Sequence, residues 1–498
     1  MLLPLPAAAA AGLVRSGRPA VSHGVQSGDV SATSAVLWAR ADRPARMFVE
    51  VSPTESFRRV RRVTGPILGH GSDLTGKTVL RGLPAGQDVF YRVVLSDPDD
   101  DARTGEPAVG RFRTAPAGVA DIRFLWSADL GGQGWGIDPS RGAYRIFESM
   151  RRLDPDFFLC SGDLIYADGV IPAEKPLADG TVWRNIITPE KSKVAETLAE
   201  YRGNYRYNLL DENFRRFNAE VPQINSWDDH EVTNNWYPGE ILDDSRYTEK
   251  RVDVLAARAR QAFHEYLPTS IRSDDEGRIY RVQRYGDLLD VFVIDMRSYK
   301  DPNTTGLETA SDGGVFGRQQ LEWLKQQLRA SQATWKVLAA DLPISLVVPD
   351  GAAIEAIAQG EPGKPLGREL EIADLLSYAK RHHITGMVWV TGDVHYTAAH
   401  HCHPARARFT DFDPFWEFVS GPLNAAVGVA PEPNRIDATF GPEVVYSQAA
   451  PTADVGNPAF GYQFFGEVAF DRDTRAMTVR LRDIDGSILY TVELPPSD

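Results

Sequence analysis

The chain has 498 residues, of which 43% are hydrophobic and 24% charged, so it can bury a large core in more than one structural unit. Its formal net charge of -14 argues against a nucleic-acid backbone as its main partner, because that role requires a basic face. Its two cysteines, Cys160 in an apolar run and Cys402 in a His-rich stretch, indicate unpaired thiols and exclude a disulfide framework.

Residues 1–20 are rich in Leu, Pro and Ala and include a shortened apolar region over residues 2–14. They lack a positively charged start, so two interpretations stay open: the remnant of an export signal, or a disordered arm. The first interpretation predicts a secreted, periplasmic or cell-surface protein. No other stretch approaches 18 uninterrupted apolar residues, so we expect no transmembrane span.

Residues 21–116 consist of short alternating apolar runs separated by turn residues. Residues 35–39, 47–51 and 89–95 are typical of half-buried strands, and the cluster at 97–101 is a turn signal. Short strands at this spacing predict a small all-β domain, a β-sandwich. We find no catalytic cluster in it.

The character of the sequence changes after residue 121, where predicted strands alternate with helices. Residues 122–126 and 156–160 are predicted strands around a helix over residues 140–153, which is a βαβ rhythm. Further helices are predicted at 248–266, 317–330 and 370–382, and further strands at 288–294, 335–340 and 387–390. Residues 121–498 are therefore predicted to form one α/β domain.

Polar residues follow four of the predicted strands of this domain. Carboxylates that meet at one sheet edge repel each other and need a cation between them. Oxygen ligands with one histidine and one phenol suit ferric iron, manganese or calcium better than a structural zinc site. An Asp after a strand is also a common turn or helix-cap residue, so the inference depends on the whole set. The set is Asp129 after residues 122–126, Asp163 and Tyr166 after 156–160, Asp228, Asp229, His230, Asn234 and Asn235 after 221–226, and Asp393 and His395 after 387–390.

The order of these motifs resembles the calcineurin-like metallophosphoesterases and, within them, the PhoD-like alkaline phosphatase and phospholipase D family. The resemblance covers residues 121–485, and residues 21–114 resemble that family's amino-terminal β-sandwich. The family's fold implies a four-layer α/β/β/α sandwich related to purple acid phosphatases. The strings that carry the resemblance are Asp129-Leu130-Gly131, Gly162-Asp163 with Tyr166, Asp228-Asp229-His230-Glu231, Gly392-Asp393-Val394-His395, residues 227–235, and residues 411–418 followed by Gly421-Pro422-Leu423.

The resemblance implies two metal ions. Asp163 would bridge them, and Tyr166 would bind ferric iron beside His395 and Asp129. The second ion would be divalent, with calcium as the first expectation and manganese, magnesium or zinc as alternatives. Its further ligands would be Asp229 and Asp393.

Three positions depart from the usual pattern, and the last of them, Asp393, makes the second site richer in oxygen. Asp129 follows Ala128 where many PhoD-like members have a cysteine ligand. Asp229 stands where the wider superfamily usually has asparagine, and Asp393 stands where it usually has histidine. The superfamily's further histidine ligand after a middle strand is not evident near residues 340–343.

The same resemblance implies hydrolysis of a phosphoric ester by a water that the two metals activate. His230 would protonate or stabilise the leaving oxygen, although a structural histidine is the alternative. Arg297 would clamp phosphate oxygens, or else form a surface salt bridge. Asn234 and Asn235 would touch the substrate, or else serve as turn residues.

Three functions are therefore compared. The first is a phosphomonoesterase or phosphodiesterase acting on small phosphate esters, and the second is a phospholipase D-type or phosphotriester hydrolase using the same site. The third is a non-enzymatic metal-binding surface module. The sequence gives no indication of oligomeric state.

Overall fold

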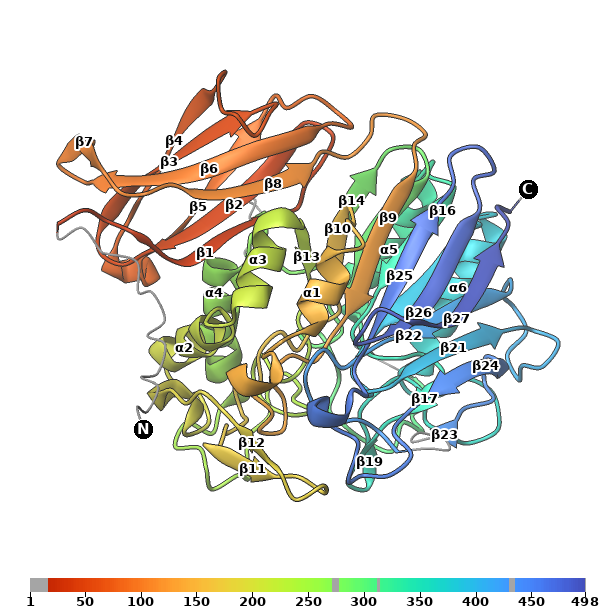
Figure 1. The fold of residues 1–498 in the computed structure, drawn as a ribbon. Helices are drawn as coiled ribbons and strands as arrows, with labels where there is room; N and C mark the ends of the chain where they lie inside the picture. Colours follow the sequence, from red (N-terminus) through yellow and green to blue (C-terminus); the bar gives the residue numbers. More distant parts are fainter. Residues whose placement is uncertain (1–16, 271–276, 311–313, 430–434, 498) are drawn as a thin grey trace.

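The computed structural model describes residues 17–270, 277–310, 314–429 and 435–497. Residues 1–16, which carry most of the expected export-signal segment, lie outside this part. Within the described residues, no helix combines the length and the apolar character that crossing a bilayer requires. Figure 1 shows a β-rich region at the amino-terminal end and a larger region in which helices flank two sheets.

The first large sheet has nine strands in the order β27-β26-β25-β9-β10-β13-β1-β2-β5. The neighbours β9, β10 and β13 are parallel, so their carboxyl ends meet at one edge. The strands are β1 (Val21–Gly28), β2 (Ser34–Ala41), β5 (Thr75–Arg81), β9 (Ile122–Ser127), β10 (Phe157–Cys160), β13 (Gln223–Asn225), β25 (Phe464–Phe470), β26 (Met477–Asp483) and β27 (Ile488–Leu494).

The second large sheet has seven strands in the order β14-β15-β16-β20-β22-β21-β24. Its central strands β15, β16, β20 and β22 are parallel. The strands are β14 (Arg281–Tyr285), β15 (Leu289–Val293), β16 (Trp335–Ala339), β20 (Met387–Thr391), β21 (Thr397–Cys402), β22 (Phe415–Val419) and β24 (Pro442–Gln448). Three short hairpins or pairs accompany the sheets: β11 (Glu174–Pro176) with β12 (Val182–Arg184), β17 (Leu346–Val347) with β23 (Arg435–Ile436), and β18 (Pro349–Asp350) with β19 (Ala353–Ile354).

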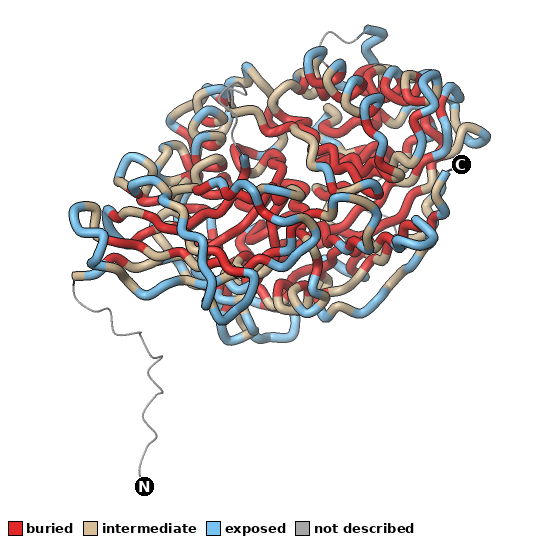
Figure 2. Tube along the Cα trace, turned by 90° about the horizontal axis from the view of Figure 1, so that it is seen from above, coloured by how far each residue is buried: buried red, intermediate tan, exposed pale blue. Residues whose placement is uncertain are grey.

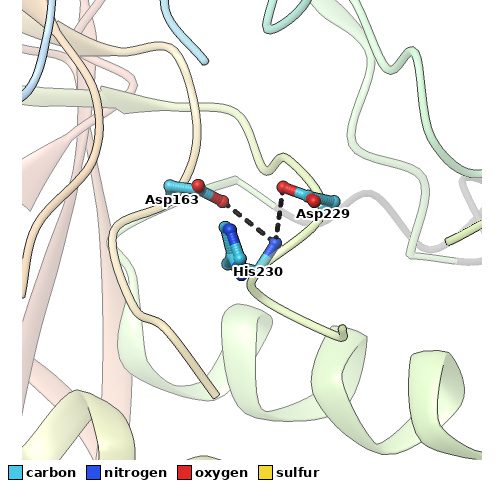
Figure 3. A group of neighbouring side chains, drawn as sticks. All are labelled: Asp163, Asp229 and His230. Atoms are coloured by element: carbon cyan, nitrogen blue, oxygen red, sulfur yellow. Dashed lines mark hydrogen bonds between the residues drawn. The ribbon is translucent and has the colours of Figure 1, made fainter. Parts of the chain in front are cut away.

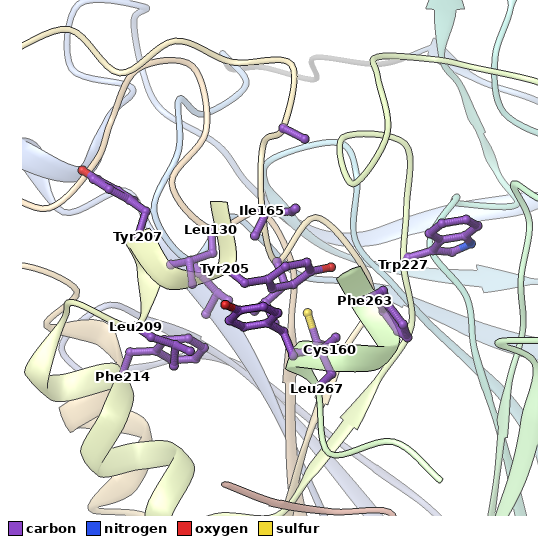
Figure 4. Close-up of a cluster of buried hydrophobic side chains, with 14 of the residues drawn as sticks. Leu130, Cys160, Ile165, Tyr205, Tyr207, Leu209, Phe214, Trp227, Phe263 and Leu267 are labelled. Atoms are coloured by element: carbon purple, nitrogen blue, oxygen red, sulfur yellow. The ribbon is translucent and has the colours of Figure 1, made fainter. Parts of the chain in front are cut away.

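In the part of the chain that the structure describes, six α-helices cover the outer faces of the two sheets. α1 to α4 pack on the first sheet through one apolar cluster, part of which is drawn in Figure 4. α5 and α6 pack on the second sheet through another cluster, to which α5 contributes Leu321, Leu324 and Leu328 from one helical face. The helices are α1 (Ile146–Arg151), α2 (Leu198–Asn208), α3 (Glu212–Glu220), α4 (Val252–Tyr266), α5 (Gly317–Ala330) and α6 (Glu369–Arg381).

The two sheets face each other across a third apolar cluster. In β9, Phe124 and Trp126 point into this cluster, whereas Leu125 points toward the helices. Because both faces of these strands are buried, their sequences are continuous apolar runs and do not alternate. Figure 2 shows the buried residues running through the interior and the exposed residues in the outer loops. The order of layers is helix, sheet, sheet, helix, which confirms the predicted α/β/β/α sandwich.

The amino-terminal region is all-β, as predicted. Its own five-stranded sheet comprises β3 (Ala45–Ser52), β4 (Arg61–Leu68), β6 (Asp88–Asp97), β7 (Asp100–Thr104) and β8 (Ala108–Arg113). This sheet packs on β1, β2 and β5 through a separate apolar cluster. β1 also pairs with β13 at Gly28 and Gln223, so the first large sheet continues from the α/β region into the amino-terminal region. The boundaries 21–116 and 121–498 remain predictions.

Candidate metal centre

The four predicted strand-end carboxylates converge at the carboxyl ends of the central strands. Asp129 follows β9, Asp163 follows β10, Asp229 follows β13, and Asp393 follows β20 in the facing sheet. All four have side chains that are buried or nearly buried. This edge is where parallel sheets of α/β proteins usually bind ligands.

The first group of ligand atoms belongs to Asp129, Tyr166 and His395. The Tyr166 hydroxyl lies 3.2 Å from Asp129 Oδ1 and 2.8 Å from His395 Nε2. His395 Nε2 lies 3.1 Å from Asp129 Oδ1. His395 Nδ1–H donates a hydrogen bond to the carbonyl oxygen of Ala426 at 2.5 Å, so the lone pair of Nε2 is directed at the group.

The second group contains Asp163, Asp229 and His230, with Asp228 and Asp393 beside it. Possible ligand atoms of Asp163, Asp229 and His230 all lie within 4.8 Å of one another, and so do those of Asp228, Asp229 and Asp393. Figure 3 shows how the first three are held together: the His230 backbone N–H donates to Asp163 Oδ1 at 3.0 Å and to Asp229 Oδ1 at 2.9 Å. One peptide group therefore brings two carboxylates from different strands together.

Backbone conformation also marks these residues. Asp129, Asp163, Asp393 and His395 have φ angles of 68°, 51°, 68° and 57°, in the left-handed region that non-glycine residues rarely adopt. Such conformations persist where the surrounding structure imposes them, and they cluster at functional sites. Four of the six predicted ligands share this feature.

The electrostatics of the group favour a cation. Burial, followed by repulsion from Asp229, raises the pKa of Asp163 well above its usual range. Burial and the neighbouring Glu355 raise the pKa of Asp393 in the same way. A positive ion among these carboxylates would relieve the repulsion and return the pKa values toward the ordinary range.

The residues present fit a hard metal ion. Asp129 Oδ2 is buried and has no hydrogen-bond partner, which is the situation of a carboxylate oxygen kept for a ligand. The donors are carboxylate oxygens, a phenol and imidazole nitrogens, and no thiol joins them, since Cys160 Sγ instead lies 3.4 Å from the Gly162 carbonyl. This donor set suits metal ions that prefer oxygen and imidazole ligands over thiolates.

His230 is held by a residue that the sequence interpretation missed. Its Nδ1 lies 2.8 Å from Asp168 Oδ1, and its ring stacks on Tyr166 with ring centroids 4.1 Å apart. Burial alone would lower the pKa of His230, but the Asp168 and Asp229 carboxylates outweigh it and raise the pKa to about 10. Nε2, on the other side of the ring, is left to face the cavity.

A cavity of about 400 Å³ opens over these groups. Asn234 and Asn235 line it, and their contact with substrate stays a prediction. The Asn235 side chain is engaged with the β18–β19 hairpin, donating to Asp350 Oδ1 at 3.1 Å. The remaining lining residues are Gln133, Asp163, Asp229, His230, Val348, Pro349, Glu355, Asp393, Val394, His395, Ala426, Val427 and Gly428.

Arg297 lies beneath the cavity and does not contribute to its described lining. Its side chain is fully buried, so the alternative of a surface salt bridge is wrong. The guanidinium pairs with Asp228 and Glu355, with Asp341 at 3.2 Å and with Asp393 at 3.3 Å. A clamp on phosphate oxygens would need these bonds to open; the observed bonds suit an internal counter-charge for the carboxylates.

Sequence interpretation missed Asp168, Glu355 and the burial of Asp341. Asp168 lies two residues after Tyr166 in the same strand-end loop, and that proximity was a usable signal. Glu355 follows a two-residue strand, β19, and has no local motif that indicates a site. Trp227, labelled in Figure 4, was predicted only as part of a family string. It anchors the motif by donating from its indole to Asp295 Oδ1 at 3.0 Å.

Comparisons with known proteins agree with this architecture. Alkaline phosphatase D of Bacillus subtilis (strain 168) is 29% identical over 409 residues, which cover 76% of this chain and 65% of that protein. The chain thus spans slightly less than two thirds of the length of this relative. A solved structure described as PhoD matches with a TM-score of 0.69 at 21% identity, covering 95% of this chain and 88% of the other. The purple acid phosphatase PPD1 from yellow lupin (Lupinus luteus) seeds matches with a TM-score of 0.56 at 11% identity, covering 97% and 75%.

These two structural matches show the fold, and the family models extend the agreement to the sequence. The model of the PhoD-like phosphatase N-terminal domain matches residues 7–116. The model of the PhoD-like phosphatase itself matches residues 124–481, which is well over half of the chain and contains every residue of the metal centre. The chain therefore belongs to the PhoD-like phosphatase family.

Proposed function

We propose that this protein is a metal-dependent phosphoric ester hydrolase. The observation that carries the proposal is the convergence of Asp129, Asp163, Asp229, Asp393 and His395 at one sheet edge. Membership of the PhoD-like family supports the same activity. A non-enzymatic metal-binding module would have no use for a cavity that places His230 beside the ligands.

Each ligand has a proposed role. Asp129, Tyr166 and His395 would hold ferric iron, Asp229 and Asp393 would hold a divalent ion with calcium first, and Asp163 would reach both. Bound metal ions would supply positive charge to the phosphate oxygens and lower the pKa of water. The protein would supply the orientation, since backbone bonds fix the carboxylates before any substrate arrives.

His230 is the proposed general acid. Asp168 accepts from Nδ1, so the imidazolium presents the Nε2–H to the cavity, where it can protonate a leaving alkoxide. The second oxygen of Asp168 accepts from the backbone N–H of Asn234 at 2.9 Å, which keeps the carboxylate in place. Asn234 and Asn235 are proposed to contact the substrate from the same loop.

Phosphodiesters are the proposed preferred substrates. Asp163, Asp229, Glu355 and Asp393 line the cavity, and among the described residues no Lys or Arg does. A diester carries one negative charge and a monoester dianion two, so this lining opposes the diester less. Val348 and Val427 offer apolar contact to the second ester group. A phospholipase D-type or phosphotriester activity is the second candidate, supported by the same apolar wall.

Substitution of the shared ligand tests the activity. Asp163→Asn should reduce turnover of a chromogenic phosphodiester by at least about 100-fold, because the amide lacks the charge that the ions require. The matched control is Asp413→Asn, an exposed carboxylate outside the site, which should leave turnover unchanged. Full activity of Asp163→Asn with unaltered circular dichroism would reject the proposal.

Colour tests the iron assignment. A tyrosinate bound to ferric iron should give a visible absorption band, which Tyr166→Phe should remove while iron content is measured in parallel. A colourless, iron-free protein with full activity would overturn this assignment and leave the hydrolase proposal standing. Rates on a monoester, a diester, a triester and a choline phospholipid, measured on one preparation, separate the two candidate activities.

A further inference from the structure

A second concave surface lies in the amino-terminal region, distant in sequence from every residue of the metal centre. It is a groove of about 740 Å³, larger than the cavity over the metal ligands. Its walls come from the end of β3, the loop between β3 and β4, the first residue of β4, the loop between β5 and β6, and the start of β6. The lining residues are Val51, Ser52, Pro53, Arg58, Arg59, Val60, Arg61, Gly82, Leu83, Pro84, Gln87, Asp88 and Val89.

The groove is basic in a protein whose overall charge is strongly acidic. Arg58, Arg59 and Arg61 line it, and Arg62 and Arg81 lie next to lining residues in the chain. Arg61 is fixed by donation to the carbonyl of Arg81 at 2.7 Å. Within the described residues, neither Arg58 nor Arg59 has an ion pair or a side-chain hydrogen bond.

The acid in the wall does not neutralise these arginines. Asp88 pairs with Arg113, whose Nε lies 3.0 Å from Asp88 Oδ1. Arg58 and Arg59 are exposed and both line the groove without an acidic partner among the described residues. Arginine forks match phosphate geometry better than lysine does, which indicates a phosphate-bearing ligand.

The groove also offers apolar contact. Val51, Leu83 and Val89 are buried in its floor, and Val60 stands at its rim with 46% of its surface exposed. On β4, which begins at the next residue, Ile67 is 54% exposed. A fully hydrated soluble polyanion gains nothing from such a surface, whereas a phospholipid headgroup brings glycerol and acyl carbons together with its phosphate.

We propose that this groove docks the protein on an anionic phospholipid bilayer, with headgroup phosphates on Arg58, Arg59 and Arg61 and Val60 entering the interface. β4 is the terminal strand of its sheet and lies at the outer edge of the amino-terminal region, which leaves the groove accessible (Figure 1). The surface shares no residue with the proposed hydrolase site, so the two proposals fail independently.

Vesicle sedimentation of the full chain tests the docking. We expect binding to vesicles of phosphatidylcholine mixed with phosphatidylglycerol, weakening as salt is added, and little binding to phosphatidylcholine alone. The variant Arg58→Glu/Arg59→Glu/Arg61→Glu should lose at least about 100-fold in partition coefficient, since each arginine near an anionic surface contributes about fivefold. Val60→Ser should weaken binding about threefold by removing apolar contact.

The matched control is Arg318→Glu/Arg329→Glu/Arg381→Glu, which makes the same charge change at exposed positions of α5 and α6. It should retain vesicle binding, and both triple variants should hydrolyse a soluble ester like the parent, which verifies folding. Absence of binding to the anionic vesicles, or equal loss in both triple variants, would overturn the proposal. Binding of soluble inorganic polyphosphate without vesicle binding, or an unaffected Val60→Ser variant, would overturn the assignment to a lipid surface.

Discussion

At the scale of single residues, the site is built from side chains whose freedom has been removed. The carboxylates of Asp163 and Asp229 share one backbone donor, and His230 is locked between Asp168 and the ring of Tyr166. These side chains therefore need to move little during the reaction, and this is the property that makes preorganised polar sites effective. The contacts of His230 give the sharpest test.

Asp168→Asn should act mainly through His230. Without the carboxylate, the imidazolium is less stable and less well oriented, so protonation of the leaving group suffers. We expect kcat to fall about 10–100-fold for an alkyl ester, with KM little changed and with a smaller loss for a nitrophenyl ester, whose leaving group needs no proton. Steady-state kinetics on the two esters measure the difference.

The control for this prediction is the double variant with His230→Ala. If Asp168 acts through His230, then Asp168→Asn should cause no further loss of kcat in a protein that already carries His230→Ala. Additive losses, or equal losses for the alkyl and nitrophenyl esters, would contradict the positioning role.

Arg297 gives a second prediction at this scale. Arg297→Met leaves Asp228, Asp341, Glu355 and Asp393 without their counter-charge, and removing one partner of a buried ion pair costs about 3–5 kcal/mol. When a chelator has removed metal ions from both proteins, Arg297→Met should therefore begin to unfold at a clearly lower temperature than the parent. Added calcium or manganese should stabilise the variant more than the parent, because a cation then supplies the missing charge.

The comparison variant is Arg113→Met, which breaks an exposed ion pair with Asp88 and should shift stability by less than about 1 kcal/mol. A metal-induced rise in melting temperature that is no larger in Arg297→Met than in the parent would contradict the role of internal counter-charge.

The residues that sequence could identify are those attached to strand ends. Asp163 and Asp393 each follow a continuous apolar run, so their place at the sheet edge could be anticipated from chain order alone. Glu355 reaches the same cavity from a coil after β19, and Arg297 turns inward beneath it. The local sequence pattern does not indicate where either side chain points, because their positions depend on how loops from both sheets fold over the sheet edge.

At the scale of elements, hydrophobic periodicity predicted the bounds of long helices more accurately than those of short ones. α5 begins and ends at the predicted residues, since its leucines repeat at helical spacing. The helix predicted over residues 140–153 is reduced to a 3₁₀ turn at Pro139–Arg141 and α1, because Gly142 adopts φ of 87° between them. α2 and α3 were not predicted, and α2 buries polar Asn204 and Asn208, which hide its apolar face.

The junction of α5 and α6 gives a pH prediction. Glu371, in the first turn of α6, accepts from the backbone N–H groups of Val315 and Phe316, both at 2.7 Å. Burial raises the pKa of Glu371 to about 7. Between the ordinary carboxyl pKa and pH 7, Glu371 is therefore protonated in the folded protein and ionised in the unfolded chain. The stability that comes from this bound proton is full at low pH and is lost as the pH rises to 7.

Glu371→Gln, which cannot titrate, isolates this contribution. The free energy of unfolding of the parent minus that of the variant should decrease by about 3 kcal/mol between pH 4.5 and 7, as measured by denaturant unfolding. Glu322→Gln, at an exposed position on α5, provides the comparison slope of a surface carboxyl. A constant or rising difference over this interval would show that the carboxyl is ionised in the folded state.

At the scale of the whole molecule, the sequence predicts two domains joined by a linker, whereas in the fold the two regions share one sheet. Residues 114–118 have linker composition, yet Thr114 is buried and its hydroxyl donates to the Pro84 carbonyl at 2.6 Å. Pairing of β1 with β13 could not be predicted, because it links strands nearly 200 residues apart through a single register pair. The amino-terminal region thus extends the sheet that holds Asp163 and Asp229.

A buried ion pair reinforces this joint and carries the last prediction. Asp29, directly after β1, binds Arg281 of β14 at 2.8 Å and also accepts from Ser270, and its side chain is 1% exposed.

Calorimetry of the parent should show the amino-terminal region unfolding with the α/β region in one transition. Arg281→Met should cost about 3–5 kcal/mol by leaving Asp29 uncompensated, and an earlier transition for the amino-terminal region should separate. Arg43→Met, which breaks the exposed pair with Asp42, should leave one transition near the parental temperature. Two transitions already in the parent would mean that the shared sheet does not couple the regions, and the amino-terminal region would then be an independent module.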